Sequence, residues 1–238
     1  MTVEVLGSKF EIDQARAELH RRGLSCTSRW WRRIICKLGL VKEINVGDYI
    51  KSWDVLKTAH FIETNIPTDA PILDIGGYAS EILCVLHRLH YSNLTGVDLN
   101  PKIKKMPYAD AIHYETADFM TTPFDSASFD VITAISVIEH GLDSQSLLAE
   151  VSRLLRPGGY FVASFDYWPD KIDTSGISIF GLDWRIFSRT EVMSFIDEAS
   201  KYNLMPCGAL NLDTQEQTVK TIGRNYTFAW MALQKTRA

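Results

Sequence analysis

Between Ala70 and Tyr167, short apolar runs alternate with segments of helical periodicity, and this alternation constrains the fold more than any other feature. Pro71–Ile75 is followed by glycines and then by Ser80–His90, whose apolar residues recur at helical spacing. Phe129–Ile138 is a β-branched run, typical of a strand that is buried on both faces. Strands that alternate with helices indicate crossover connections, a parallel sheet and a doubly wound α/β fold.

The pattern changes near the end of the chain. Leu204–Leu212 and Tyr226–Gln234 are typical of two late strands joined by a polar turn, which predicts an antiparallel edge on the parallel sheet. We therefore expect a mostly parallel seven-stranded sheet with an antiparallel last strand. The other predicted elements are strands over Asn93–Leu99, Ala111–Asp118 and Tyr160–Tyr167, a helix over Asp143–Arg156 that stops at Pro157-Gly158-Gly159, and a helix over Ser188–Tyr202.

The N-terminal region lacks this alternation and differs in charge. Residues 1–64 hold eleven Lys and Arg against eight Asp and Glu, although the whole chain has a net charge of -4. Arg21–Lys37 has six basic residues, no acidic one, and Trp30 and Trp31 among them. This composition suits a basic amphipathic helix. Such a helix either binds an anionic ligand, a membrane surface or a partner, or it covers the neighbouring domain, and both alternatives stay open. We expect a helical appendage or lid over 1–65 and a main domain over 66–238, with a substrate insert at about 168–187.

Length and composition exclude several classes of protein. The chain has 238 residues, of which 46% are hydrophobic, so it is not a disordered or fibrous chain. Its longest apolar runs are too short to span a membrane, and its charged N-terminus does not resemble a signal peptide, so we expect a cytoplasmic protein. The four cysteines lack CxxC spacing, and the carboxylates lack ligand spacing, so we expect no metal. The acidic main domain argues against a nucleic-acid partner.

A glycine turn follows the first strand of the alternating region. Gly76 and Gly77 come just after Asp74, at the strand end where ligands bind in open α/β sheets. Asp98 closes the next strand, where a carboxylate can accept both hydroxyl hydrogens of a ribose. The third glycine of a dinucleotide site is missing, and Tyr78 follows the pair, which disfavours pyrophosphate and a nicotinamide-dependent oxidoreductase.

Four ordered segments, LDIGG, GVDLN, ADF followed by FDVITAISVIEH, and LLRPGGYFVASF, resemble the motifs of class I S-adenosylmethionine-dependent methyltransferases of the small-molecule type. The resemblance covers about residues 70–167 and implies a Rossmann-like methyltransferase fold with S-adenosyl-L-methionine as cofactor. The family usually has glycine where Tyr78 stands, so the amino-acid pocket is expected to differ there. The resemblance implies that Asp74, Gly76 and Gly77 contact the amino-acid part of the cofactor, Asp98 its ribose, Leu99, Asp118 and Phe119 its adenine, and Ile135 and Ser136 its sulfonium side.

Several of these residues also have simpler readings. Asp74 and Asp98 could close turns, and Asp118 could cap a helix. Two residues are candidates for the catalytic base. His140 follows the fourth strand, and its ordinary pKa suits proton removal near neutrality. Asp166 ends the fifth strand. The alternatives are that His140 only shapes the pocket and that Asp166 caps a loop.

The acceptor has to be inferred from the appendages, because the predicted core is generic. Five of the six tryptophans lie outside residues 70–167 and before the last strand, where they line an acceptor pocket or anchor the appendages. We expect methylation of a hydroxyl on a sugar or secondary metabolite, in polysaccharide biosynthesis for instance. The alternatives are an N- or C-methyltransferase and an inactive partner subunit, and a homodimer is left open. The acceptor residues expected are Trp53, Tyr167, Trp168 and Trp184.

Overall fold

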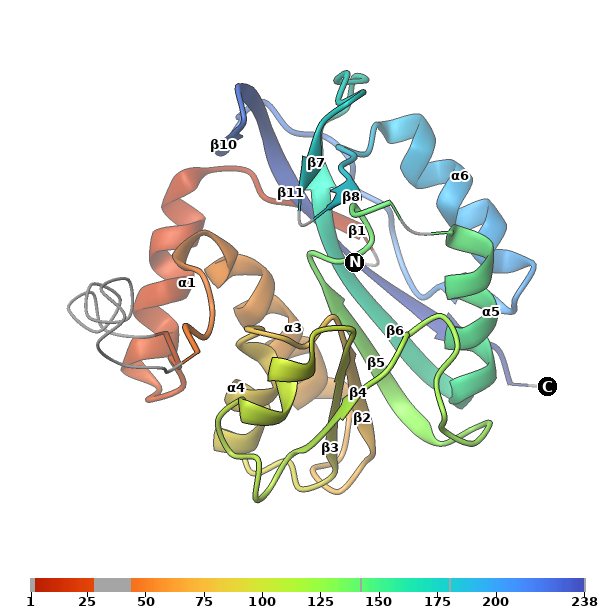
Figure 1. Cartoon of the computed structure of the whole chain (residues 1–238). Coiled ribbons are helices and arrows are strands. Elements are labelled where there is room, and N and C mark those ends of the chain that lie inside the picture. Colours follow the sequence, from red (N-terminus) through yellow and green to blue (C-terminus); the bar gives the residue numbers. More distant parts are fainter. Residues whose placement is uncertain (1–2, 28–43, 142, 180, 238) are drawn as a thin grey trace.

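The computed structural model describes residues 3–27, 44–141, 143–179 and 181–237 and is built around one twisted sheet (Figure 1). Its main path runs β1-β11-β6-β5-β2-β3-β4, and β9 and β10 also pair with β11. The pairs among β2, β3, β4, β5 and β6 are parallel, whereas β11 is antiparallel to β6. The sheet strands are β1 (Val3–Val5), β2 (Ile72–Ile75), β3 (Leu94–Asp98), β4 (His113–Thr116), β5 (Phe129–Ile135), β6 (Leu155–Tyr167), β9 (Leu204–Pro206), β10 (Val219–Thr221) and β11 (Arg224–Lys235).

This topology confirms the predicted fold class, a doubly wound sheet with an antiparallel last strand. Helices cover both faces: α1, α3 and α4 lie on one side in Figure 1, and α5 and α6 on the other. A short antiparallel pair, β7 (Ser178–Ile179) and β8 (Leu182–Asp183), stands apart from the sheet. The helices are α1 (Lys9–Arg21), α3 (Ser52–Asn65), α4 (Ile82–Arg88), α5 (Ser144–Leu154) and α6 (Arg189–Ser200), with short 3₁₀ helices η1 (Tyr49–Lys51) and η2 (Pro101–Lys105).

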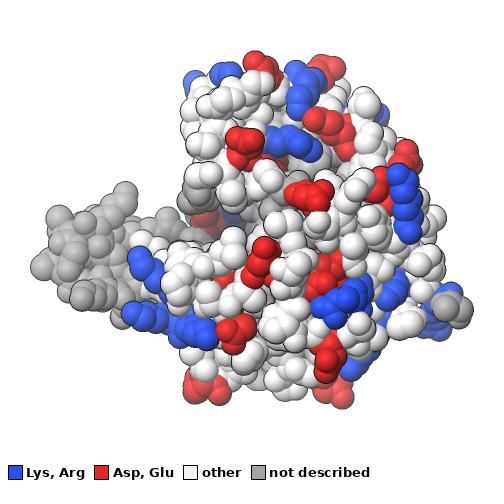
Figure 2. Space-filling model, turned by 45° about the vertical axis from the view of Figure 1, so that its right-hand side comes forward, with Lys and Arg blue, Asp and Glu red and all other residues white. Residues whose placement is uncertain are grey.

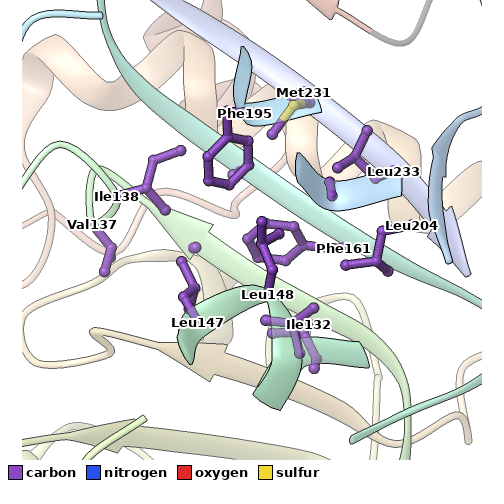
Figure 3. Packing of buried hydrophobic residues seen from close by; sticks show 14 of the residues in the cluster. Ile132, Val137, Ile138, Leu147, Leu148, Phe161, Phe195, Leu204, Met231 and Leu233 are labelled. Carbon is purple, nitrogen blue, oxygen red and sulfur yellow. The ribbon is translucent and has the colours of Figure 1, made fainter. Parts of the chain in front are cut away.

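The core has a layer on each face of the sheet because the central strands are apolar on both sides. Ile132 of β5 belongs to one hydrophobic cluster with Leu148 of α5 and Phe195 of α6 (Figure 3). The next residue toward the N-terminus, Val131, belongs to the opposite cluster, together with Ala59 of α3. The β-branched run was predicted to be buried on both faces, and it is.

Two predicted boundaries are wrong. Pro157-Gly158-Gly159 does not end the helix: α5 ends at Leu154, and β6 begins at the next residue. The register with β5 shifts here, from Phe129 opposite Leu155 to Val131 opposite Tyr160, so the Pro-Gly-Gly sequence forms a bulge inside the strand. The strand predicted over Leu204–Leu212 shortens to Leu204–Pro206.

The N-terminal region adds to both the helical layer and the sheet. Helices α1 and α3 are joined to the main domain by Arg16, which donates two hydrogen bonds of 2.9 Å to Glu81, at the start of α4. Strand β1 pairs antiparallel with β11. Trp30, Trp31 and most of Arg21–Lys37 lie outside the described residues. Among the helices of the described ranges, none is both long enough and apolar enough to span a bilayer.

Candidate functional site

The predicted cofactor residues meet at one edge of the sheet. Asp74 lies near the carboxyl end of β2, Asp98 ends β3, and Ser136 follows β5. These strands are parallel neighbours, so their ends open on the same side. The edge therefore brings together side chains that are up to 62 residues apart in the sequence.

The glycine turn after β2 depends on the absence of a side chain at Gly76. Its φ is +70°, and a Cβ there would lie 2.5 Å from Cγ2 of Val137. L residues other than glycine rarely adopt this φ, and the contact is with a buried side chain in the loop after β5. The Tyr78 side chain packs against the α3–α4 side of the core. Its backbone N–H donates to Asp98, so the turn is tied to the end of the next strand.

Two backbone N–H groups hold the carboxylate of Asp98 at the edge of the sheet. Tyr78 N donates to Oδ2 at 3.1 Å, and Asn100 N donates to Oδ1 at 2.8 Å. Each carboxylate oxygen has two lone pairs, so both can accept a further hydrogen bond from a ligand. The neighbouring Leu99 side chain is 60% exposed, an apolar surface beside this carboxylate.

Asp74 is buried beneath the glycine turn. Its Oδ1 accepts a 2.6 Å hydrogen bond from Thr133 Oγ1, whereas Oδ2 receives none from any residue that the structure describes. A Cβ added at Gly77 would lie 3.4 Å from that oxygen, so Oδ2 faces the turn. Burial raises the pKa of Asp74 to about 7. A buried acceptor of this kind suits a cationic amino group, so the residues present fit the amino-acid part of S-adenosylmethionine.

The remaining predicted cofactor residues vary in accessibility. Asp118 is half-buried, and its Oδ1 accepts from Met120 N at 2.9 Å, so it closes a turn. Phe119 is buried in the core, and Ile135 is half-buried at the end of β5. Ser136 has a φ of +54°, and its buried Oγ has no hydrogen-bond partner among the described residues. Backbone strain of this kind is common at binding sites.

Next to this edge, Asp166 and His140 lie near each other. Asp166 is 4% exposed; its Oδ2 accepts a 2.8 Å hydrogen bond from Trp184 Nε1. His140 is half-buried, and its backbone bridges to Trp184 of the insert. Burial lowers the pKa of His140, and the charge of Asp166 partly opposes that shift. A neutral imidazole near neutral pH can accept a proton.

Two buried carboxyl groups and a lysine, none of them predicted as site residues, lie at the same place. Asp54 of α3 is fully buried; Ser164 Oγ donates to its Oδ2 at 3.0 Å. Glu139 is 1% exposed, and its pKa is raised well above its ordinary value, first by burial and then by Asp166. Lys51 Nζ lies 3.6 Å from Asp166 Oδ1 and 3.9 Å from Asp54 Oδ2. The available signal was a carboxylate on the apolar face of the helix at Ser52–Asn65.

Among the expected acceptor residues, Tyr167 belongs to a different part of the core from Trp53, Trp168 and Trp184, which pack around one hydrophobic cluster. Tyr167 is fully buried in the α5–α6 side of the core, and its hydroxyl donates to the Leu212 carbonyl. The prediction that Tyr167 contacts the acceptor is therefore wrong. Trp184 is buried beside Asp166, and Trp168 is half-buried. Trp53 lines a separate pocket of about 430 Å³ between α3 and the β1–β11 edge, together with Lys57, Trp230 and neighbouring residues.

The site has no metal-binding geometry in the part of the chain that the structure describes, where no group of three or more His, Cys, Asp or Glu side chains could hold a metal ion. The described side chains at the site include carboxyl groups, one lysine and one imidazole. Such a set can bind hydroxyl groups and cations and can accept a proton.

Comparison with known proteins identifies the central part of the chain. Residues 73–163 match a family described as a methyltransferase domain. An O-methyltransferase of Penicillium expansum is 33% identical over 100 residues, 38% of this chain and 36% of that protein. A phthiotriol/phenolphthiotriol dimycocerosates methyltransferase of Mycobacterium tuberculosis is 38% identical over 90 residues, 36% of this chain and 32% of that protein. The chain thus matches about a third of the length of these curated relatives.

Solved structures agree on the fold over a larger part of the chain. The crystal structure of geranyl diphosphate C-methyltransferase from Streptomyces coelicolor A3(2) superposes with a TM-score of 0.57 at 19% identity. That likeness covers 82% of this chain and 89% of that one. At this identity it establishes the fold alone.

Proposed function

We propose that this chain, whose residues 73–163 match a family described as a methyltransferase domain, is a class I S-adenosylmethionine-dependent methyltransferase that transfers a methyl group from that cofactor to a small molecule. The single observation that carries the proposal is the carboxylate of Asp98, held by two backbone N–H groups at the end of β3 beside the glycine turn. It has the acceptor capacity that the two hydroxyl groups of a ribose require.

The other cofactor contacts are assigned to residues at the same edge. Asp74 and the turn at Gly76 and Gly77 would hold the amino-acid part, with the open oxygen of Asp74 accepting from its ammonium group. Leu99, Asp118 and Phe119 would contact the adenine. Ile135 and Ser136 would line the sulfonium side. When bound, S-adenosylmethionine supplies a methyl group already activated by its positive sulfur.

The protein's part in the reaction is to align the acceptor and to remove its proton. The bound cofactor would supply the methyl carbon and keep the electron pair of its carbon–sulfur bond, and a base of the chain would take the proton that the acceptor hydroxyl loses. His140 is the proposed base because it is half-buried and its lowered pKa keeps it neutral near pH 7. Asp166 is the second candidate, but it is buried and already paired with Trp184 and Lys51.

The acceptor proposed is a hydroxyl-bearing small molecule, with a sugar in polysaccharide biosynthesis as the favoured class and a secondary metabolite as the second. Acidic and basic side chains are interspersed over the face in Figure 2, which supports a small acceptor rather than a nucleic acid. The matched relatives include an O-methyltransferase, and a structural neighbour is a C-methyltransferase. Transfer to nitrogen or carbon, and an inactive partner subunit, are therefore the alternatives. A cytoplasmic location and a homodimer belong to the same proposal.

The experiment that tests this function is a mass-spectrometric screen of small hydroxylated compounds, incubated with the full chain and S-adenosylmethionine. We expect a product heavier by one CH₂ and an equal amount of S-adenosylhomocysteine. The His140→Ala variant should turn over about 10²–10⁴ times more slowly while it binds S-adenosylhomocysteine normally. A variant with the rate of the wild type would exclude His140 as the base and leave Asp166 or solvent.

A further inference from the structure

The buried carboxyl groups beside the proposed methyl-transfer site outnumber the cations that pair with them among the described residues. We call Asp54, Glu139 and Asp166 the acidic cluster; none of the three is more than 4% exposed. Lys51 is the cation paired with it in the described structure, through Asp54 and Asp166. Asp54 and Asp166 thus share one ammonium, and the charge of Asp166 disfavours ionisation of the neighbouring Glu139. Buried charges are costly unless they are paired, so the acidic cluster needs a further cation or takes up protons.

The oxygens of the acidic cluster have open positions. Asp54 Oδ1 and Glu139 Oε2 are buried and accept no hydrogen bond from a described residue, and Asp166 Oδ1 faces Lys51 only at the ion-pair distance of 3.6 Å. The three oxygens come from three different elements, namely α3, the loop after β5, and β6. Open, buried acceptors on separate elements are typical of a site for a donor group that is absent from the protein itself.

The aromatic residues around the acidic cluster suit an organic ammonium group. Lys51 Nζ lies 3.4 Å from the centre of the Phe228 ring, a close cation–π contact. The rings of Trp184 and Tyr226 pack edge to face beside Asp166, with centroids 5.6 Å apart and the Trp184 indole bonded to that carboxylate. Lys51 is the most exposed of the charged groups, with 19% of its side chain accessible, and it belongs to the short helix η1. The lysine therefore marks the side from which another cation can approach.

We propose that the acceptor carries a protonated amine, which binds against the acidic cluster beside Lys51 and the Phe228 ring while a hydroxyl group of the same molecule receives the methyl group. The substrate class is then a hydroxylated amine, such as an amino sugar, rather than a neutral sugar. This inference rests on the proposed function, because it concerns the acceptor of the same site. Glu139 and Asp54 act in it as specificity-determining residues.

The test uses matched pairs of probes that differ in one group: glucosamine against glucose, and ethanolamine against ethylene glycol. Binding to the full chain saturated with S-adenosylhomocysteine is measured by ligand-observed NMR. We expect the amine of at least one pair to bind ten times or more tightly than its hydroxyl counterpart. Equal binding within both pairs, or no binding of any probe, overturns the proposal.

Two charge-changing variants should shift the affinity for the amine probe in opposite directions. Glu139→Gln should weaken binding of the amine at least tenfold and leave that of the hydroxyl probe unchanged, because a bound ammonium favours the ionised form of Glu139 and glutamine cannot ionise. Lys51→Met should strengthen amine binding, because it removes the competing cation and keeps the alkyl chain. Glu198→Gln and Lys201→Met, from the surface ion pair at the end of α6, are the controls with no expected effect. If both cluster variants weaken binding alike, the residues serve only the structure and the proposal fails.

Calorimetric titration with S-adenosylhomocysteine distinguishes a failure of this inference from a failure of the proposed methyltransferase function. Variants that bind the nucleoside like the wild type, but show no change in amine preference, contradict the inference and leave the methyltransferase proposal standing. A wild-type chain that does not bind the nucleoside contradicts the proposed function itself. Should Glu139→Gln fail to fold, Asp54→Asn makes the same change from another element, with the same expected loss.

Discussion

At the scale of single residues, the glycine turn is the most sensitive part of the cofactor site. Gly76→Ala should abolish binding of S-adenosylhomocysteine and lower stability, because the new Cβ would lie 2.5 Å from Val137 at a φ of +70°. Gly176→Ala is a matched control with a φ of +73° and no atom within 4 Å of the added Cβ. The control should lose about 1 kcal/mol from backbone strain alone. Calorimetry and urea unfolding measure both effects, and equal losses in the two variants would show that the Val137 contact is unimportant.

Asp74 predicts a pH effect on stability. Burial raises its pKa from 3.8 to about 7, so the folded protein binds this proton more tightly than the unfolded chain does. Its contribution is therefore fully present below about pH 4 and is lost as the pH rises toward 7. Asp74→Asn cannot ionise, so the variant should gain stability relative to the wild type as the pH rises from about 4 to about 7, on the order of 1 kcal/mol per pH unit, and the gain should stay level above that.

Urea unfolding of both proteins at pH 5 and at pH 8 checks this effect. Comparing the two proteins at each pH cancels the titration of all other groups that they share. A difference in unfolding free energy that does not change between the two pH values would mean that Asp74 is not held in a dry environment.

At the scale of elements, one buried ion pair joins the N-terminal helices to the main domain. The side chains of Arg16 and Glu81 are 3% and 1% exposed, and Arg16 Nε also donates to Ser52 Oγ at 2.8 Å. Arg16→Met should cost about 3–5 kcal/mol because it leaves Glu81 buried without its cation, and Arg16→Met/Glu81→Met should recover part of that loss. Arg21→Met removes an exposed pair with Glu18 and should cost less than about 1 kcal/mol. Urea unfolding is the measurement, and similar losses for Arg16→Met and Arg21→Met would contradict this account.

The elements that could be predicted from the sequence are those whose signals are local. The helix predicted over Ser188–Tyr202 is observed at Arg189–Ser200, where Ser188 forms a capping box with Glu191. The bulge at Pro157-Gly158-Gly159 could not be distinguished from a helix stop, because proline and glycine mark both. Strand β1 was missed because three residues give no periodicity, and its pairing with β11 spans nearly the whole chain.

At the scale of the whole molecule, the cofactor residues of the candidate site have local sequence signals, whereas the acidic cluster depends on long-range contacts. Asp74, Gly76 and Asp98 were predicted because a turn or strand end identifies each of them within a short stretch. The acidic cluster was not predicted as a unit, since the bond from Ser164 to Asp54 joins residues 110 apart in the sequence. Only the packing of α3 over the sheet brings the carboxyl group of Asp54 close to Asp166. Tyr167, one residue further along the same strand, faces the opposite side because strand side chains alternate.

The central claim is that this edge of the sheet binds S-adenosylmethionine, and calorimetric titration of the full chain tests it most directly. S-adenosylhomocysteine should bind at one site per chain, and NAD should not bind. Asp98→Ala should weaken the binding free energy of S-adenosylhomocysteine by about 1.5–3 kcal/mol for each charged hydrogen bond lost. Asp197→Ala, an exposed carboxylate on α6, should leave the affinity unchanged. Binding of NAD without S-adenosylhomocysteine, binding of neither, or an unaltered affinity in Asp98→Ala would contradict the account.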